Sequence, residues 1–215
     1  MTSLLPGAPF LYAIIDASMI GLRSLSEWVG LLSGPGRASI VQWRFKGITD
    51  AAALESAHEL REATRAAGVL LIINDRPDIA RMVGADGVHV GQDDLDANDA
   101  RALLPGGIVG VSTHNQAQFE VALTRPVDYI AVGPVFSTTS KADPDPLVGL
   151  EFVSWASSRT TKPIVAIGGI NAPNARSVVN AGARGLAVIS EVMRAEHPDR
   201  AATALARAMR PSAAR

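Results

Sequence analysis

Eight short apolar runs recur along the chain, and this pattern constrains the fold more than any other feature. The runs span residues 10–16, 38–44, 69–73, 86–90, 107–112, 127–133, 163–167 and 185–190. Each has the length of a buried β-strand, and longer stretches with helical periodicity separate them. Alternation of strands and helices predicts a parallel sheet. Eight such units in 215 residues predict a single α/β domain, a (β/α)8 TIM barrel.

The intervening stretches carry helix signals. The apolar stripe of residues 50–68 is expected to run through Leu54, Ala57, His58 and Leu60. Gly68 then follows as a stop signal. A later helix is predicted to begin at Asn171 as its N-cap, with Pro173 in its first turn.

The alternative fold is an open, doubly wound sheet. That fold would more often carry a GxGxxG turn after the first strand, and the segment "IIDASMIGL" has none. No linker divides the chain, so residues 1–215 are expected to form one domain, with a frayed tail from about residue 208.

Charge and composition exclude several classes of protein. The net charge is −1 with no basic tail, which argues against binding nucleic acid or a membrane surface. The absence of cysteine excludes a disulfide scaffold, a thiolate nucleophile and a cysteine-ligated zinc. No apolar stretch approaches the length of a membrane span, so we expect a cytoplasmic protein.

Polar residues follow the predicted strands, at the barrel end where such folds carry their chemistry. In "VQWRFKG", alternate residues point to opposite faces of the strand. One face carries Val41, Trp43 and Phe45, and should meet the helices. The other carries Gln42, Arg44 and Lys46, and should point into the barrel mouth. Burying two cations inside a barrel costs free energy unless an anion pairs with them. An edge strand with one solvent-exposed face would also explain these two residues.

Acidic residues follow the next two strands. Asn74 and Asp75 end one strand segment, and Asp93 and Asp94 follow the next. Carboxylates at neighbouring strand ends can share Mg²⁺, which takes one or two of them and leaves other positions to water and phosphates. Each residue singly is also an ordinary helix cap or turn former.

The remaining strand ends complete a polar rim. Ser112 and His114 follow the fifth strand, the run "STTSK" (137–141) follows the sixth, and paired glycines follow the seventh. The hydroxyl-rich run alone could be a solvated loop. Together the rim offers two anion sites: cations with a metal for a pyrophosphate, and backbone N–H groups of the last two loops for a monophosphate.

The ordered set "VQWRFKG", "NDRPDIARMVGADGVHVGQDD", "GVSTH", "GPVFSTTSK", "IGGI" and "AVIS" resembles the thiamine phosphate synthase family over nearly the whole chain. The resemblance implies a transferase. A hydroxymethylpyrimidine pyrophosphate loses pyrophosphate through a pyrimidine cation, and the ring nitrogen of a thiazole phosphate attacks the methylene to give thiamine monophosphate.

The resemblance also implies roles for individual residues. Gln42, Arg44 and Lys46 would bind the pyrimidine pyrophosphate, with further pyrophosphate contacts from Asn74, Ser112 and Lys141. Asp75 and Asp94 would hold Mg²⁺. Thr138, Thr139 and Ser140 would touch the thiazole phosphate, together with the backbone at Gly169, Ile189 and Ser190. The catalytic set would be Lys141, Arg44, Lys46 and Ser112.

Two departures from the family pattern stand out. Phe45 replaces a usual glutamate, on the face expected to meet the helices, and Ser140 replaces a threonine but keeps the hydroxyl. The alternatives are a thiazole tautomerase, which shares the barrel and uses a histidine such as His114, a generic phosphate-barrel isomerase, and a non-catalytic barrel that binds a phosphate ligand. The expected partners are the two small substrates, and a homodimer is left open.

Overall fold

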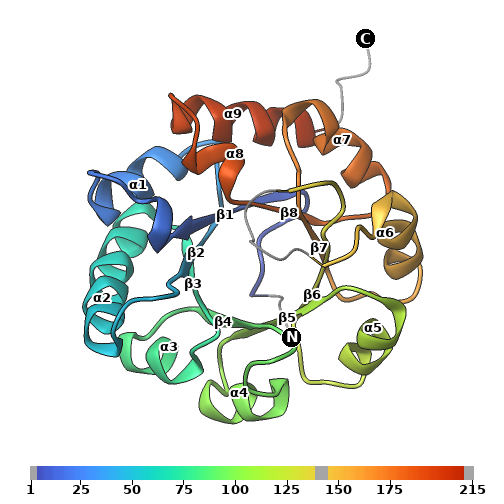
Figure 1. Cartoon of the computed structure of the whole chain (residues 1–215), viewed down its shortest axis with the longest axis horizontal. Helices are drawn as coiled ribbons and strands as arrows, with labels where there is room; N and C mark the ends of the chain where they lie inside the picture. The colour runs from blue at the N-terminus through green and yellow to red at the C-terminus, as the bar shows by residue number, and fades with distance from the viewer. Residues whose placement is uncertain (1–3, 139–144, 211–215) are drawn as a thin grey trace.

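The computed structural model describes residues 4–138 and 145–210. Eight strands close in chain order into a barrel, and the helices form a ring around it (Figure 1). Neighbouring strands pair in parallel, including the closing pair of β1 (Phe10–Asp16) and β8 (Gly185–Val188). The predicted TIM barrel is confirmed, and the open sheet is excluded by this closure.

The other strands are β2 (Ile40–Arg44), β3 (Leu70–Asn74), β4 (Gly87–Val90), β5 (Ile108–Thr113), β6 (Tyr129–Val132) and β7 (Ile164–Ile167). The helices are η1 (Ala17–Met19), α1 (Leu25–Leu32), α2 (Asp50–Ala67), α3 (Pro77–Val83), α4 (Ala97–Leu103), α5 (Gln116–Leu123), α6 (Gly149–Ser157), α7 (Ala172–Asn180), α8 (Ser190–Met193) and α9 (Pro198–Met209). Within these described ranges, no helix has the length and apolarity needed to cross a membrane.

Several predicted strand ends differ from the structure by one or two residues, and three local predictions need correction. β8 ends at Val188, and Ser190 begins α8 instead of ending the strand. The helix α9 reaches Met209, whose side chain is buried, so residues 208 and 209 are not part of a frayed tail. In α2 the buried stripe contains Ala53, Ala57, Leu60 and Thr64, while His58 is exposed.

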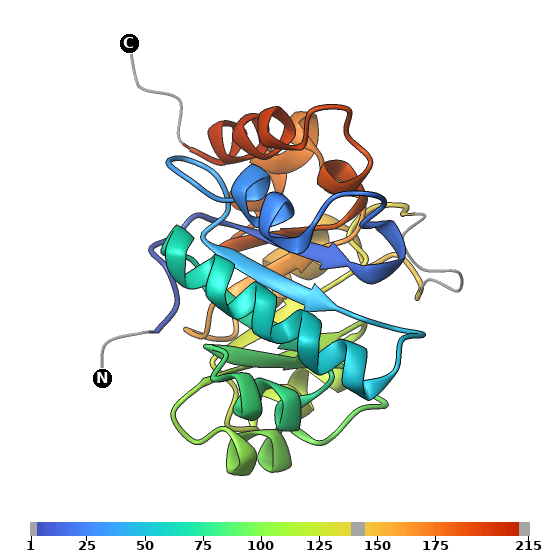
Figure 2. The same ribbon diagram turned by 90° about the vertical axis from the view of Figure 1, so that its left-hand side faces the viewer.

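Other local predictions are confirmed by the caps. α2 ends at Ala67 and is followed by Gly68, which adopts the left-handed conformation that glycine favours. α7 begins after Asn171, whose side chain accepts a hydrogen bond from the backbone N–H of Asn174. Figure 2 shows α2 lying along the outside of the barrel, where it contacts β2 and β3.

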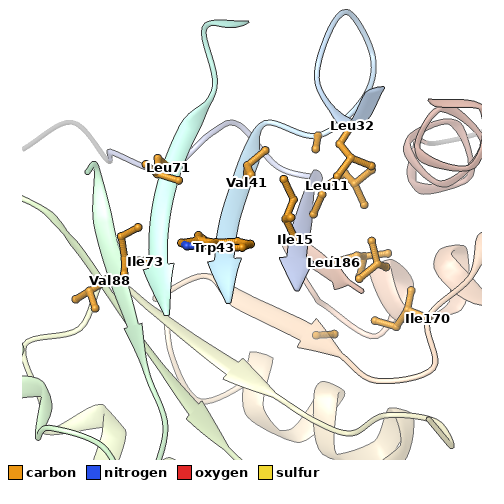
Figure 3. Close-up of a cluster of buried hydrophobic side chains, with 14 of the residues drawn as sticks. Leu11, Ile15, Leu32, Val41, Trp43, Leu71, Ile73, Val88, Ile170 and Leu186 are labelled. Atoms are coloured by element: carbon orange, nitrogen blue, oxygen red, sulfur yellow. The ribbon is translucent and has the colours of Figure 1, made fainter. Parts of the chain in front are cut away.

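The core has two parts, one on each side of the barrel wall. The larger part lies between strands and helices, and Figure 3 shows Val41, Trp43 and Leu71 on that outer face. The smaller part fills the barrel interior and includes Leu5, Ile40 and Ile72. Packing on both faces explains why most strands read as continuous apolar runs.

The alternation predicted for β2 is confirmed. Phe45 packs on the outer cluster, with its ring centroid 6.0 Å from that of Trp43. The departure at residue 45 therefore changes packing against the helices and leaves the barrel mouth untouched. Gln42, Arg44 and Lys46 all point into the mouth, where they line a common cavity.

Candidate active site

A cavity of about 630 Å³ opens at the carboxyl ends of the strands. It is lined by every described residue that the sequence assigned to the site: Gln42, Arg44, Lys46, Asn74, Asp75, Asp94, Ser112, Thr138, Gly169, Ile189 and Ser190. Thr139, Ser140 and Lys141 lie outside the described residues. The structure therefore brings together side chains that are up to 148 positions apart in sequence, from Gln42 to Ser190.

Arg44 is held in the cavity wall by Asp16, its neighbour in the pairing of β1 with β2. Asp16 is 2% exposed, and it also accepts hydrogen bonds from the backbone N–H and the hydroxyl of Ser18, at 2.9 and 2.6 Å. Burial opposes the ionisation of Asp16, but the Ser18 hydrogen bonds and the Arg44 charge outweigh it and lower its pKa. The carboxylate thus stays ionised and fixes the guanidinium.

Asp75 and Asp94 lie side by side. Burial, reinforced by the adjacent Asp94, raises the pKa of Asp75 to about 6, against the lowering effect of Lys46. The ammonium of Lys46 lies 3.4 Å from a carboxylate oxygen of Asp75. Asp94 is oriented by the backbone N–H of Gly91, which donates to its Oδ2 at 2.7 Å.

The backbone at Asp75 is unusual, because its φ of 64° is left-handed and Asp75 is not a glycine. Aspartate and asparagine tolerate this region better than other residues. The residue's N–H donates to the carbonyl of His89 at 2.7 Å. This turn aims the carboxylate at Asp94 instead of continuing β3.

Two adjacent carboxylates suit a magnesium ion that completes its shell with phosphate oxygens and water. Across residues 4–138 and 145–210, no three His, Cys, Asp or Glu side chains gather as a metal cluster. These two carboxylates therefore suit a metal ion that binds together with an anionic ligand. They suit less well a metal ion that is held by protein side chains alone.

A buried chain of hydrogen bonds crosses the cavity floor. The amide of Gln42 donates to the hydroxyl of Tyr12 at 2.7 Å, and that hydroxyl lies 3.0 Å from the hydroxyl of Tyr129. His89 joins the far end, with its Nδ1 2.8 Å from Tyr129 and its Nε2 2.8 Å from the hydroxyl of Ser112. Burial strongly raises the pKa of both tyrosines, so both stay neutral.

The opposite wall of the cavity is built by the loops after β6 and β7. The N–H of Phe136 donates to the carbonyl of Gly168 at 3.0 Å. Gly169 has a φ of 62°, and a β-carbon there would lie 2.4 Å from the carbonyl oxygen of Ser137. Only glycine therefore lets the two loops meet this closely.

Glu191 lies in the first turn of α8, next to Ser190, and also lines this wall. Its carboxylate accepts the backbone N–H of Ala172 at the start of α7. Burial nevertheless raises the pKa of Glu191. An anion bound at Ser190 would therefore meet a carboxyl that takes up a proton more readily than an exposed one.

His114 lies at the rim and is anchored to the loop after β6. Its Nδ1 lies 2.6 Å from the carbonyl oxygen of Gly133, and its Nε2 lies 3.5 Å from Asp145. The ring is thus held by the protein on both sides.

The sequence reasoning missed Tyr12, Asp16, His89 and Tyr129. All four lie within apolar runs, at the inward positions of their strands. The alternation rule applied to β2 would have found them had it been applied to β1, β4 and β6 as well.

Comparison with known proteins gives a consistent result. The family model described as thiamine monophosphate synthase matches residues 11–192. The thiamine-phosphate synthase of Chloroflexus aurantiacus is 44% identical over 195 residues, which cover 91% of this chain and 90% of that protein. The thiamine-phosphate synthase of Koribacter versatilis is 44% identical over 190 residues, covering 86% and 89%.

Solved structures agree. The thiamine phosphate pyrophosphorylase from Pyrococcus furiosus superimposes with a TM-score of 0.82 at 33% identity, covering 94% of this chain and 95% of that one. A 3-hexulose-6-phosphate synthase reaches a TM-score of 0.65 at 17% identity, a likeness of fold alone.

Proposed function

This chain belongs to the thiamine monophosphate synthase family, and on that premise we propose how its cavity divides between two substrates. As a member, it is a transferase that joins a hydroxymethylpyrimidine pyrophosphate to a thiazole phosphate and forms thiamine monophosphate and pyrophosphate. One observation carries the proposal: the described residues that match the family motifs all line a single cavity.

The pyrophosphate lies at the β2 to β5 side of the cavity. Gln42, Arg44 and Lys46 bind the pyrimidine pyrophosphate, and Asn74 and Ser112 add polar contacts. Arg44 is fixed by Asp16, so it meets the pyrophosphate with little loss of side-chain freedom. Lys141 contributes a further cation in this proposal, on the strength of the sequence motif.

Asp75 and Asp94 would hold Mg²⁺ together with the pyrophosphate. The two adjacent carboxylates support this, because their mutual repulsion is relieved by a divalent cation. When bound, the ion neutralises charge on the leaving pyrophosphate. Lys46 already partly neutralises Asp75 in the protein alone.

The thiazole phosphate lies at the β6 to β8 side. Backbone N–H groups at Gly169, Ile189 and Ser190 bind its oxygens, and Thr138 adds a hydroxyl. Thr139 and Ser140 extend this contact on the strength of the sequence motif. The starts of α7 and α8 favour an anion at this place.

In the reaction, the bond between the pyrimidine methylene carbon and the pyrophosphate oxygen breaks, and the oxygen keeps the electron pair. The thiazole nitrogen then forms the new bond to that carbon. Negative charge grows on the pyrophosphate, so Arg44 and Lys46 stabilise the transition state more than the bound substrate. Both cations touch the reacting group and are catalytic residues in this sense.

The test is an assay with both substrates and Mg²⁺, with thiamine monophosphate and pyrophosphate measured as products. Equal amounts of the two products support the proposal. A thiazole carboxylate phosphate supplied alone tests the tautomerase, and its isomerisation without any synthase activity would replace the proposal. Binding of either phosphate without turnover would indicate a ligand-binding barrel. The cytoplasmic location and a homodimer stay predictions.

A further inference from the structure

The buried chain of side-chain hydrogen bonds that links Gln42 to Ser112 contains groups that differ in how many hydrogen bonds they can donate. An amide nitrogen only donates, a tyrosine hydroxyl donates once and accepts, and a neutral imidazole donates from one nitrogen and accepts at the other. The first link fixes a direction, because the Gln42 amide nitrogen donates to Tyr12 at 2.7 Å. The hydrogen of Tyr12 must then go elsewhere.

The direction propagates across the barrel. Among the described residues, the hydrogen bonds of the Tyr12 hydroxyl go to Gln42 and Tyr129, so Tyr12 donates to Tyr129. Tyr129 in turn donates to Nδ1 of His89. Nδ1 is therefore an acceptor, and the ring proton lies on Nε2, which donates to the hydroxyl oxygen of Ser112.

Protonation of both ring nitrogens of His89 would leave this chain of hydrogen bonds with one hydrogen bond unmade. The ring would donate from Nδ1 to Tyr129, and Tyr129 would then donate to Tyr12. The hydroxyl of Tyr12, which is 1% exposed, would receive two donors and keep its own hydrogen without an acceptor in the chain. An unmade hydrogen bond of this kind is costly in a buried place. His89 also stacks on Tyr129, with ring planes 18° apart, which limits any rotation of the imidazole.

We propose that this series of hydrogen bonds runs in one fixed direction and that His89 is a positioning residue. Its Nε2–H donates to the hydroxyl oxygen of Ser112, and this directs the hydroxyl hydrogen of Ser112 into the cavity. With its oxygen already accepting from His89, Ser112 acts toward the cavity as a donor. A donor suits an anionic pyrophosphate and does not suit a cation. The role of Ser112 toward the pyrophosphate rests on the proposed function, whereas the direction of the chain does not.

The tautomer of His89 is the direct test, and it needs no substrate. In protein with ¹⁵N-labelled histidine at about pH 8, where unperturbed imidazoles are neutral, long-range ¹H–¹⁵N correlations identify the protonated ring nitrogen. We expect the proton of His89 on Nε2. His114 serves as an internal reference with the opposite tautomer expected, because its Nδ1 faces the carbonyl of Gly133, which can only accept a hydrogen bond. The exposed His58 and His197 should show mixtures of both tautomers.

A proton on Nδ1 of His89 in the unaltered protein would overturn the proposal, since the chain would then run the other way. Tyr129→Phe removes the donor to Nδ1 and should convert His89 to a mixture of tautomers. An unchanged tautomer in that variant would also count against the chain. The unaltered protein remains decisive if Tyr129→Phe does not fold.

A second arm measures the consequence for turnover. His89→Gln can place an amide N–H near the position of Nε2, whereas His89→Asn reaches only the position of Nδ1. We expect kcat/KM for the pyrimidine pyrophosphate to be about 10-fold lower in His89→Asn than in His89→Gln, the scale of one hydrogen bond to a charged group. Equal values would contradict the positioning role. Failure of the unaltered protein to form thiamine monophosphate would instead refute the proposed function and leave the tautomer result standing.

Discussion

Asp16 does not line the cavity, yet it fixes the orientation of Arg44, a cation that does. Its carboxylate pairs with Arg44 and takes two hydrogen bonds from Ser18. Because Asp16 is 2% exposed, few of its contacts can be replaced by water. The Asp16 side chain therefore determines both the position of Arg44 and the free-energy cost of burying the guanidinium charge.

Asp16→Asn keeps the shape but removes the charge. We expect KM for the pyrimidine pyrophosphate to rise about 10-fold and the free energy of unfolding to fall by about 3 kcal/mol at neutral pH. KM for the thiazole phosphate should change little, because Arg44 lies on the other side of the cavity. Ser18→Ala is the matched control, since it removes one hydrogen bond to Asp16 and leaves the ion pair. Equal rises in both KM values would indicate general damage instead.

Asp75 gives a pH-dependent prediction. Folding raises its pKa from 3.8 to about 6, so the folded state binds this proton more tightly than the unfolded state. Ionised Asp75 therefore penalises folding above about pH 6, and the penalty is lost as the pH falls toward 3.8. Asparagine tolerates the left-handed backbone and carries no charge.

We therefore expect metal-free Asp75→Asn to be more stable than the parent at pH 8, by about 1 kcal/mol after allowance for solvent screening. The gain should shrink steadily as the pH is lowered through 6 to 4. Urea unfolding in the presence of a chelator measures it. A gain that stays constant across this range would mean that the ionisation of Asp75 is not its source.

How far single residues can be predicted depends on where their partners lie. Arg44 and Lys46 were predictable because two cations alternate within one apolar strand. Alternation also places Tyr12 and His89 on the inward face of their strands, but their roles were not predictable, because each looks like a core residue within its own run. Their roles come from Tyr129, which lies 117 positions beyond Tyr12 and meets it only when the barrel closes.

At the scale of elements, the side of the cavity that is proposed to hold the thiazole phosphate depends on two loops that pack against each other. The loop after β7 passes so close to the loop after β6 that a β-carbon at Gly169 would lie 2.4 Å from the carbonyl oxygen of Ser137. The backbone φ of 62° adds a conformational cost for any other residue.

Gly169→Ala should separate these two effects when it is compared with Gly68→Ala. Gly68 has a similar φ of 67° but has no atom within 4 Å of the added β-carbon. We expect Gly68→Ala to cost about 1 kcal/mol from conformation alone, and Gly169→Ala to cost at least 1 kcal/mol more. KM for the thiazole phosphate should rise only in Gly169→Ala. Equal stability losses and unchanged KM values in both variants would show that the close approach is not needed.

Element boundaries were predictable where the sequence changes character abruptly. β1 was predicted over residues 10–16 and occupies them, because an apolar run ends there in a polar cap. β8 was extended two residues too far, since Ile189 continues the apolar run up to Ser190 although the backbone already turns into α8. The stripe of α2 was misplaced because small residues, Ala53 and Thr64, occupy the packed positions.

At the scale of the whole molecule, the barrel makes one site from many distant strand ends. Ligands that contact several strands at once stabilise the closed barrel against global unfolding. Pyrophosphate with Mg²⁺ should therefore raise Tm much more than either alone, because in the proposed site Asp75 and Asp94 would hold the metal together with the anion. At one hundred times Kd, the gain of about 2.7 kcal/mol corresponds to about 5–10 °C for a chain of this size.

Asp94→Asn should abolish most of this joint shift, because it leaves a single carboxylate for the metal. Asp93→Asn is the matched control: this neighbour is exposed and carries the same charge, so its loss should leave the shift largely intact. Thermal unfolding with pyrophosphate, with Mg²⁺ and with both together measures the effect in each protein. If pyrophosphate alone stabilises as much as the pair, the cations of the cavity suffice for binding. If Asp93→Asn loses the shift and Asp94→Asn keeps it, the carboxylate facing Asp75 is not the one that holds the metal.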